Sequence, residues 1–172
     1  MEDILTRSVA NIIPNPQALA NRLAQDTPLN IYLGIDATAT RIHLGHAVTL
    51  RKLQAFAQAG HNVTFLIGDF TALIGDTSDK DTERPILTQE QIQINFNTYQ
   101  SQASKILDFS LVKIVNNSQW LSNLNFTDII KLCQQFSAGD FYSRELIKTR
   151  LQNGKHVGLH EVLYSVMQGY DS

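Results

Sequence analysis

Two histidines, His43 and His46, lie close together in the sequence, with Leu44 and Gly45 between them. A turn-rich stretch precedes them and an apolar stripe typical of a helix follows, so the pair falls in the first turn of that helix. Helix N-termini carry unpaired N–H groups and a partial positive charge, and they receive phosphates. Gly45 lets a phosphate approach the backbone, and the histidine rings can donate hydrogen bonds to its oxygens.

The same pattern has two other interpretations. The histidines could be surface residues at an ordinary helix start. A zinc site would need further ligands, and the chain offers one cysteine and no H-E-x-x-H pattern beside the pair. We therefore expect no metal site, and phosphate binding is a hypothesis that needs support from the rest of the chain.

A second set of polar side chains is in the last predicted helix, residues 159–169, and just after it. Tyr164 and Gln168 are four residues apart, and Asp171 follows almost one turn later, so the three share a face. Their phenol, amide and carboxylate groups offer hydrogen-bond donors and acceptors at two levels along the helix axis. An amphipathic helix with a polar rim is the alternative interpretation.

The composition is that of a folded α/β protein. The 172 residues are 43% hydrophobic and 17% charged, which suits one domain that needs no disulfide or metal for stability. The formal charge of −2 argues against a chain that is basic throughout. It does not exclude a local basic patch that binds nucleic acid. The single cysteine, Cys133, excludes an internal disulfide framework and is expected in the core. With no apolar run of 18 residues and no secretory signal, we expect no membrane span and a cytoplasmic location.

Periodicity and turn signals predict the elements that position these residues. A strand at 30–35, a helix at 44–59 and a strand at 63–67 form a βαβ unit. The strand at 63–67 is apolar on both faces, which is typical of a central strand in a parallel sheet. Residues 68–85 are expected to form a long functional loop. Thr88 and Gln91 have the spacing of a capping box that opens a long helix. A further strand is predicted at 111–115, and further helices at 16–25, 120–124, 128–136, 144–152 and 159–169.

Four ordered blocks, residues 32–46, 65–76, 82–85 and 160–172, carry a resemblance to a known family. The first block resembles the HIGH signature region of class I aminoacyl-tRNA synthetases. Together the four blocks resemble the bacterial-type tyrosyl-tRNA synthetases. The resemblance implies a Rossmann-like class I catalytic domain, present as its first half with a helical connective region. Its implied parts are an N-terminal helical segment (1–29), the first half of the nucleotide-binding fold (30–115), and the connective region with the tyrosine-pocket helix (116–172).

The resemblance also implies an activity, which is ATP-dependent activation of L-tyrosine to tyrosyl-adenylate and transfer to tRNA(Tyr). ATP with Mg²⁺ is then a substrate complex, and no tightly bound cofactor is expected. In the implied pocket Asp171 and Tyr32 bind the phenolic hydroxyl, while Tyr164, Gln168 and Asp76 hold the ammonium group. The implied catalytic residues are His43, His46 and Thr38, and the implied ATP-binding residues are Asp36, Thr38, His43, Gly45, His46 and Arg84.

Three departures from the family pattern stand out. Ala37 replaces a proline that is usual in the turn, and residues 137–143 lack the basic residues common in that stretch. The sequence ends at Ser172, before the second half of the nucleotide fold, the KMSKS-type loop and the anticodon-binding domain, so we expect a fragment with activity near background. The alternatives are a non-catalytic tyrosine-binding or dimerisation module and a nucleotidyltransferase for another substrate. Helices within 126–152 are expected to form a homodimer interface.

Overall fold

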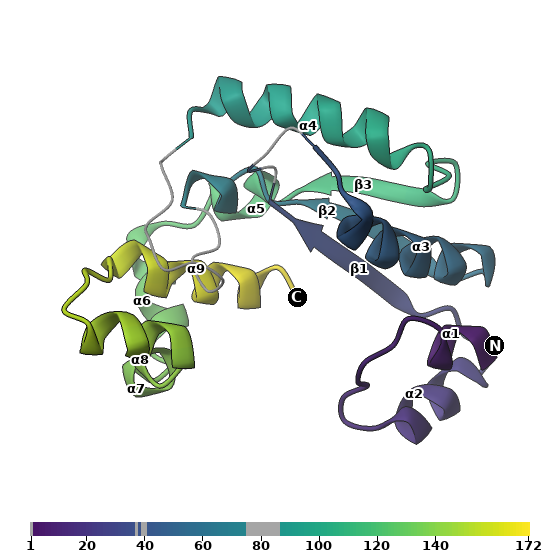
Figure 1. Ribbon diagram of the computed structural model, residues 1–172, viewed down its shortest axis with the longest axis horizontal. Helices are drawn as coiled ribbons and strands as arrows, with labels where there is room; N and C mark the ends of the chain where they lie inside the picture. Colours follow the sequence, from purple (N-terminus) through teal and green to yellow (C-terminus); the bar gives the residue numbers. More distant parts are fainter. Residues whose placement is uncertain (1, 37, 39–40, 75–86) are drawn as a thin grey trace. The chain divides into compact units, whose positions relative to one another are not determined.

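The computed structural model describes residues 2–36, 38, 41–74 and 87–172 of the chain. Within these residues the chain forms two compact units (Figure 1). The first unit takes its residues from 1–35, 39–67 and 95–115, and the second takes them from 36–38, 68–94 and 116–172.

A three-stranded sheet in the order β1-β2-β3 lies at the centre of the first unit. Strand β1 (Asn30–Ile35) pairs in parallel with β2 (Asn62–Ile67), and β3 (Val112–Asn116) lies on the other side of β2. Val63, Phe65 and Leu66 of β2 are buried on both faces of the strand. This pattern confirms the prediction of a central strand in a parallel sheet.

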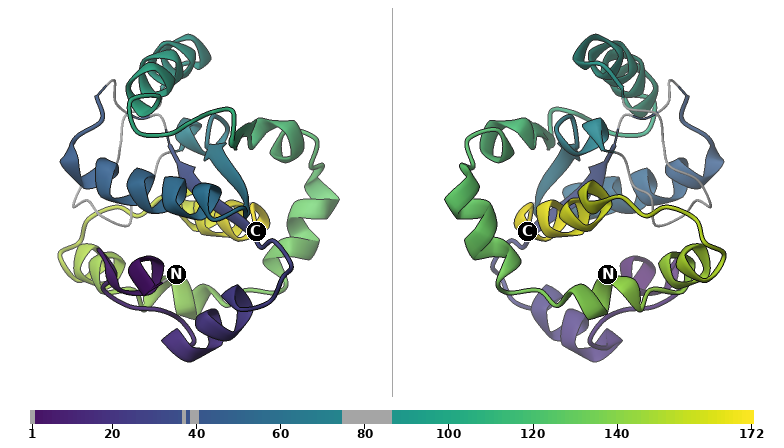
Figure 2. Two further views of the ribbon diagram at one scale, coloured as in Figure 1. Left: turned by 90° about the vertical axis from the view of Figure 1, so that its right-hand side faces the viewer. Right: turned by 90° about the vertical axis from the view of Figure 1, so that its left-hand side faces the viewer.

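Helix α3 (Leu44–Gln58) packs along one face of this sheet (Figure 2). Leu50, Leu53 and Ala57 of α3 belong to one core cluster with Val63, Phe65 and Ile67 of β2 and Val112 of β3. Gly60 follows with φ of +87°, a left-handed conformation that ends the helix. Val48 of the same helix is 46% exposed and does not share this burial.

Two short helices precede the sheet, α1 (Glu2–Thr6) and α2 (Pro16–Leu23). Asn15 caps α2, because its Oδ1 accepts a hydrogen bond from the Ala18 N–H at 2.8 Å. The sequence did not predict α1, whose five residues are too few for a periodic pattern. Its C-terminal carbonyls are bound by Lys52 of α3, which donates to Ile4 O at 2.8 Å.

Helix α4 (Gln89–Ala103) begins with the predicted capping box. Thr88 N–H donates to Gln91 Oε1 at 2.9 Å, and Gln91 N–H donates to Thr88 Oγ1 at 3.2 Å. Ile92, Tyr99 and Ala103, which are spaced to share one face of the helix, are all buried. Local capping and periodicity were therefore sufficient to predict this helix.

The second unit is mostly helical. Helices α8 and α9 lie side by side in it (Figures 1 and 2), and its short elements η1 and α7 were not predicted. Helix α6 begins two residues before its predicted start, because Asn125 and Asp128 form a capping box that the sequence analysis did not recognise. The elements are η1 (Thr71–Leu73), α5 (Ser118–Leu121), α6 (Phe126–Cys133), α7 (Ala138–Tyr142), α8 (Glu145–Gln152) and α9 (Leu159–Tyr170).

Helix α6 is amphipathic, yet none of its residues, all of which the structure describes, is buried. Phe126 is 76% exposed and Ile130 is 48% exposed. Cys133 is partly exposed, so the expectation of an ordinary core cysteine is wrong. Among the helices in the described part of the chain, none is long and apolar enough to cross a membrane.

Candidate functional site

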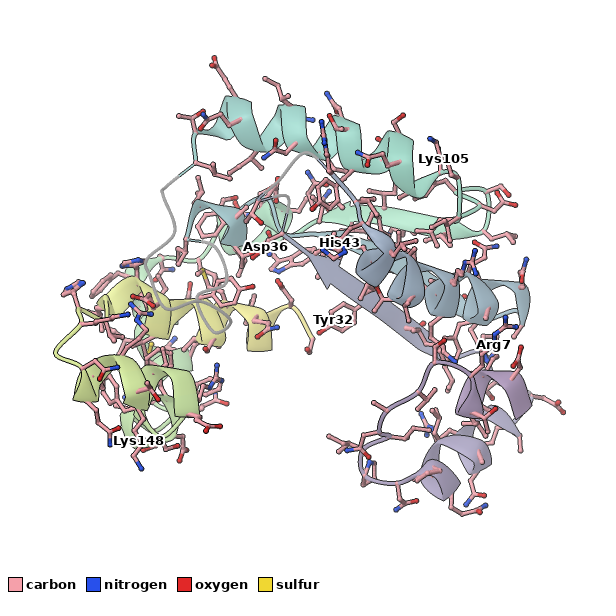
Figure 3. All side chains as sticks on the ribbon, viewed as in Figure 1. Arg7, Tyr32, Asp36, His43, Lys105 and Lys148 are labelled. Atoms are coloured by element: carbon pink, nitrogen blue, oxygen red, sulfur yellow. The ribbon has the colours of Figure 1, made fainter. Side chains whose placement is uncertain are left out.

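The two histidines lie in the first turn of α3, with His43 at the N-cap and His46 three residues later (Figure 3). Their ring centroids are 4.0 Å apart. Each ring accepts a backbone hydrogen bond through Nδ1: His43 from Gly45 N–H at 3.1 Å, and His46 from His43 N–H at 3.3 Å. The histidines therefore cap their own helix and satisfy N–H groups that would otherwise lack partners.

This capping settles which ring nitrogen carries the proton. An Nδ1 atom that accepts a hydrogen bond is unprotonated, so the neutral rings of His43 and His46 carry their hydrogen on Nε2. Both side chains can thus donate from Nε2 while remaining uncharged. That is the arrangement needed to bind phosphate oxygens at a helix N-terminus.

His46 is half-buried, whereas His43 is exposed. The His46 ring meets the buried Tyr99 ring edge-on, with centroids 6.0 Å apart. Burial lowers the pKa of His46 below its ordinary value, and the nearby charge of His43 lowers it further. His46 therefore acts as a neutral hydrogen-bond donor at neutral pH, rather than as a cation.

Gly45 is required by the histidine cap itself. A Cβ atom at this position would lie 2.9 Å from Cε1 and 3.0 Å from Nδ1 of His43. Any larger residue would displace the ring that caps the helix. Besides the predicted approach of a phosphate to the backbone, the position of the His43 ring is a second reason for glycine at this position.

In the second unit, three side chains meet where the chain leaves β1 and β2. Thr71 Oγ1 donates to Asp36 Oδ1 at 2.7 Å, and Tyr164 Oη of α9 donates to Asp36 Oδ2 at 2.9 Å. Both oxygens of the Asp36 carboxylate are thus held by hydroxyl donors. A tyrosine hydroxyl that donates its one proton can still accept a hydrogen bond, so Tyr164 presents an acceptor.

Gly68 permits this close approach. A Cβ atom at Gly68 would lie 2.1 Å from Asp36 Oδ1 and 2.3 Å from Thr71 Oγ1. Neither distance is tolerable, so any side chain at this position would push the carboxylate away from Thr71. The glycine is therefore part of what holds Asp36.

Asn117, which follows β3, joins this cluster to the end of α9. It is fully buried, and its Nδ2 donates to Thr71 Oγ1 at 3.0 Å and to Asp171 Oδ2 at 3.1 Å. Its Oδ1 accepts the Phe70 N–H at 3.0 Å. One side chain thus connects Asp171 through Thr71 to Asp36.

Asp171 receives a second donor, because Trp120 Nε1 binds its Oδ1 at 2.9 Å. Burial raises the pKa of Asp171 above its ordinary value, and the hydrogen bonds from Asn117 and Trp120 oppose that shift. The result is a partly desolvated carboxylate whose orientation is set by two N–H donors. Such a group is a strong acceptor for a ligand hydroxyl.

Asp69 forms hydrogen bonds with the segment that contains Asn117 and Trp120. Its carboxylate accepts from Ser118 N–H at 2.9 Å, from Ser118 Oγ at 2.7 Å and from Asn116 Nδ2 at 3.0 Å. These contacts hold the residues on both sides of Asn117 and the start of α5. The turn after β2 and the turn after β3 are therefore tied together.

The other predicted site residues take varied positions. Tyr32 projects from β1 on the face opposite Ile31 and Leu33, which pack against the core, and is 45% exposed (Figure 3). Gln168 is exposed on α9, and Thr38 N–H donates to Asp36 O at 2.8 Å. Two of the predicted site residues, Asp76 and Arg84, lie outside the described residues.

Sequence reasoning missed Thr71, Asn117 and Trp120 as members of this site. Thr71 lies inside the block 65–76 that carried the family resemblance, and Trp120 is the only tryptophan in the chain. Asn117 looked like an ordinary turn residue at the end of a strand. Since residues that follow parallel strands gather at one sheet edge, its position after β3 was the signal available.

Comparisons with known proteins identify the family of the chain. The family model described as tRNA synthetases class I (W and Y) matches residues 24–172. The chain therefore belongs to the class I tRNA synthetases of the tryptophan and tyrosine branch. Membership of this family also weighs against the interpretation as a nucleotidyltransferase of another kind.

Curated relatives agree over nearly the whole chain. A tyrosine–tRNA ligase of Synechococcus sp. is 47% identical over 174 residues, which cover 98% of this chain and 42% of the relative. A tyrosine–tRNA ligase 2 of Vibrio cholerae is 45% identical, with the same coverage. The chain thus spans less than half the length of these relatives.

Solved structures share the fold. A C-terminally truncated mitochondrial tyrosyl-tRNA synthetase of Coccidioides posadasii superposes with a TM-score of 0.78 at 22% identity, covering 98% of this chain and 49% of that one. A tyrosyl-tRNA synthetase of Archaeoglobus fulgidus complexed with L-tyrosine gives a TM-score of 0.72 at 21% identity, with 98% and 50% covered. These matches show the class I synthetase catalytic fold.

The His46 ring should titrate below the ordinary histidine pKa of about 6.5. The unfolded chain then binds a proton more readily than the folded one, so this residue contributes stability that is lost as the pH falls below about 6.5. Ring-proton NMR titration of the folded and the urea-unfolded chain measures the difference. In the His43→Gln variant the pKa of His46 should return only part of the way to its ordinary value, because the ring remains buried. A folded midpoint at or above the unfolded one would contradict the described geometry.

Asn117→Asp should destabilise the second unit at neutral pH. The substitution keeps the shape but replaces an N–H donor with a carboxylate facing Asp171, at an expected cost of at least about 2 kcal/mol in the free energy of unfolding. The loss should shrink on acidification, since a proton shared by the two carboxylates restores a donor. Urea unfolding at pH 7 and at pH 5 measures both effects. Asn123→Asp, at an exposed position, serves as the control, and equal losses in the two variants would count against the network.

Proposed function

We propose that this chain provides the tyrosine-binding and histidine-signature parts of a tyrosine–tRNA ligase, which activates L-tyrosine with ATP and transfers it to tRNA(Tyr). The observation that carries the proposal is the Asp171 carboxylate, which is oriented by Asn117 and Trp120. Asp171 is linked through Thr71 to Asp36, which also binds Tyr164. The curated relatives, which are tyrosine–tRNA ligases, support the same conclusion.

The tyrosine subsite follows from the chemistry of these groups. The substrate phenol donates its hydrogen to the ionised Asp171, with Tyr32 as the second phenol-binding residue. Phenylalanine has no hydroxyl and would leave the partly buried carboxylate without its ligand partner, which is how a polar site rejects an apolar analogue. At the other end of the substrate, the hydroxyl oxygen of Tyr164 accepts from the ammonium group together with Gln168 and Asp76.

The ATP subsite uses the start of α3. The Nε2–H groups of His43 and His46 donate to phosphate oxygens and stabilise the charge that develops as pyrophosphate leaves. Thr38 and Gly45 contact the phosphates, Asp36 contacts the adenylate, and the guanidinium of Arg84 meets the pyrophosphate. The tyrosine carboxylate attacks the α-phosphorus in line, and Mg²⁺ enters with ATP as part of the substrate.

We further propose the cytoplasm as the location and residues 116–172 as the connective region with the tyrosine-pocket helix. The single Cys133 suits a reducing compartment. A homodimer through the helices within 126–152 is supported by the apolar side chains that α6 exposes, Phe126 and Ile130.

Tyrosine binding tests the proposed function directly. Calorimetric titration should give binding of L-tyrosine to the chain and none of L-phenylalanine. In Asp171→Asn the tyrosine affinity should fall roughly 10- to 100-fold, or about 1.5–3 kcal/mol, because a charge-assisted hydrogen bond is lost. Acidification should weaken binding as the pH falls through the pKa of Asp171, which burial places above the usual carboxyl value.

Asp140→Asn, an exposed carboxylate on α7, is the matched control and should leave tyrosine affinity unchanged. Unaltered affinity in Asp171→Asn would refute the assignment of the phenol-binding group. Tyrosine-dependent ATP–pyrophosphate exchange by the protein then separates a ligase from a tyrosine-binding module.

The proposed dimer has its own test. Ile130→Glu places a charge in the exposed apolar stripe of α6, so it should shift the chain from dimer to monomer in sedimentation velocity. Thr127→Glu adds the same charge at an exposed polar position of α6 and should leave the dimer intact. A parent chain that sediments as a monomer would refute the interface.

A further inference from the structure

Helices α8 and α9 are joined by an ion pair that is almost completely shielded from solvent. Arg150 is 2% exposed and Glu161 is 1% exposed. Arg150 Nη1 donates to Glu161 Oε2 at 2.7 Å, and Arg150 Nη2 donates to Glu161 Oε1 at 3.1 Å. This bidentate geometry holds both the distance and the mutual orientation of the two side chains.

The same two side chains also hold the loop between the helices. Arg150 Nη2 donates to His156 O at 2.7 Å, and Gly158 N–H donates to Glu161 Oε1 at 2.8 Å. Gly158 is the N-cap of α9, so the pair reaches the residue at which the helix begins. The start of α9 is therefore tied to α8 at several atoms.

Glu161 lies on the face of α9 that carries the proposed tyrosine-binding residues. Tyr164 follows Glu161 by three residues, and Gln168 and Asp171 follow at further steps of four and three residues. Residues at these steps share one helix face. A rotation of α9 about its axis would move all of these side chains together. The ion pair restrains that rotation from the N-terminal end.

A buried ion pair is an inefficient way to stabilise a fold, because desolvation of the two charges offsets most of their attraction. Apolar side chains of similar volume often serve stability equally well. What the pair supplies in addition is geometric specificity, since two parallel N–H···O bonds permit one arrangement. A role in placing α9 therefore accounts for charges at this position better than stability alone.

We propose that Arg150 and Glu161 are positioning residues that set the rotational register of α9 and so aim Tyr164 and Asp171 at the amino-acid ligand. This inference rests on the proposed function, because it concerns the same site. The pair acts through α9 and does not touch the ligand.

The test removes the pair without leaving a lone buried charge. The Arg150→Met/Glu161→Leu variant should unfold cooperatively, as followed by circular dichroism, yet bind L-tyrosine about tenfold more weakly or worse in calorimetry. Arg144→Met is the matched control, since Arg144 also joins α8 to α9, through an exposed hydrogen bond from Nη1 to Ser165 Oγ at 3.0 Å. The control should bind tyrosine as the parent does.

A second measurement separates positioning from general stability. Tyr164→Phe should weaken tyrosine binding in the parent but have little further effect in the variant that lacks the pair, because the hydroxyl is already misplaced there. Unchanged affinity in the double variant, or equal effects of Tyr164→Phe in both backgrounds, would overturn the inference. If the double variant does not fold, Arg150→Gln/Glu161→Gln, which also removes both charges but keeps polar side chains, is subjected to the same two measurements.

Failure of the proposed function itself gives a different result, in which the parent chain does not bind tyrosine. Amide hydrogen exchange without ligand then decides the positioning role. Loss of the pair should speed exchange along α9 from Leu163 to Tyr170 and leave α3 unchanged. Unaltered exchange in α9 would overturn the inference whatever the parent binds.

Discussion

The hydrogen bonds of the buried Asn117 side chain are the interaction on which the proposed tyrosine site depends. Its two N–H groups hold Asp171 and Thr71, and its carbonyl holds the backbone of Phe70. Through Thr71 the same amide reaches Asp36, so residues far apart in the sequence share one hydrogen-bond network. An amide suits this place because it donates two hydrogen bonds and accepts one without carrying a charge that burial would penalise.

In the first turn of α3, the same two histidine side chains have two roles. Each ring uses Nδ1 to cap the helix, which leaves Nε2–H of His43 and His46 as the donor of each neutral ring. Gly45 is needed because the His43 ring folds back over it. Capping and the proposed phosphate binding are thus performed by the same two side chains, and neutrality of His46 follows from its burial beside Tyr99.

Much of the fold was predictable because its signals are local. The strand at 30–35 was predicted with its observed bounds, and the helices α3 and α4 were found from their stripes and capping residues. The helices α1 and α7 were missed, because five residues are too short for a periodic pattern. Cys133 was misplaced, because periodicity shows that one face of α6 is apolar but not whether the chain covers that face.

The sequence by itself determined the family, the order of the three strands and of the longer helices along the chain, and the residue types of the proposed site. It could do so because motifs and periodicity are properties of neighbouring residues. Tertiary structure alone decided that Asn117, Trp120 and Thr71 orient Asp171 and Asp36, and that Arg150 meets Glu161 in the interior. These contacts join side chains separated by 11 to 54 positions. Hydrogen bonds act over about 3 Å, and folding brings such residues that close.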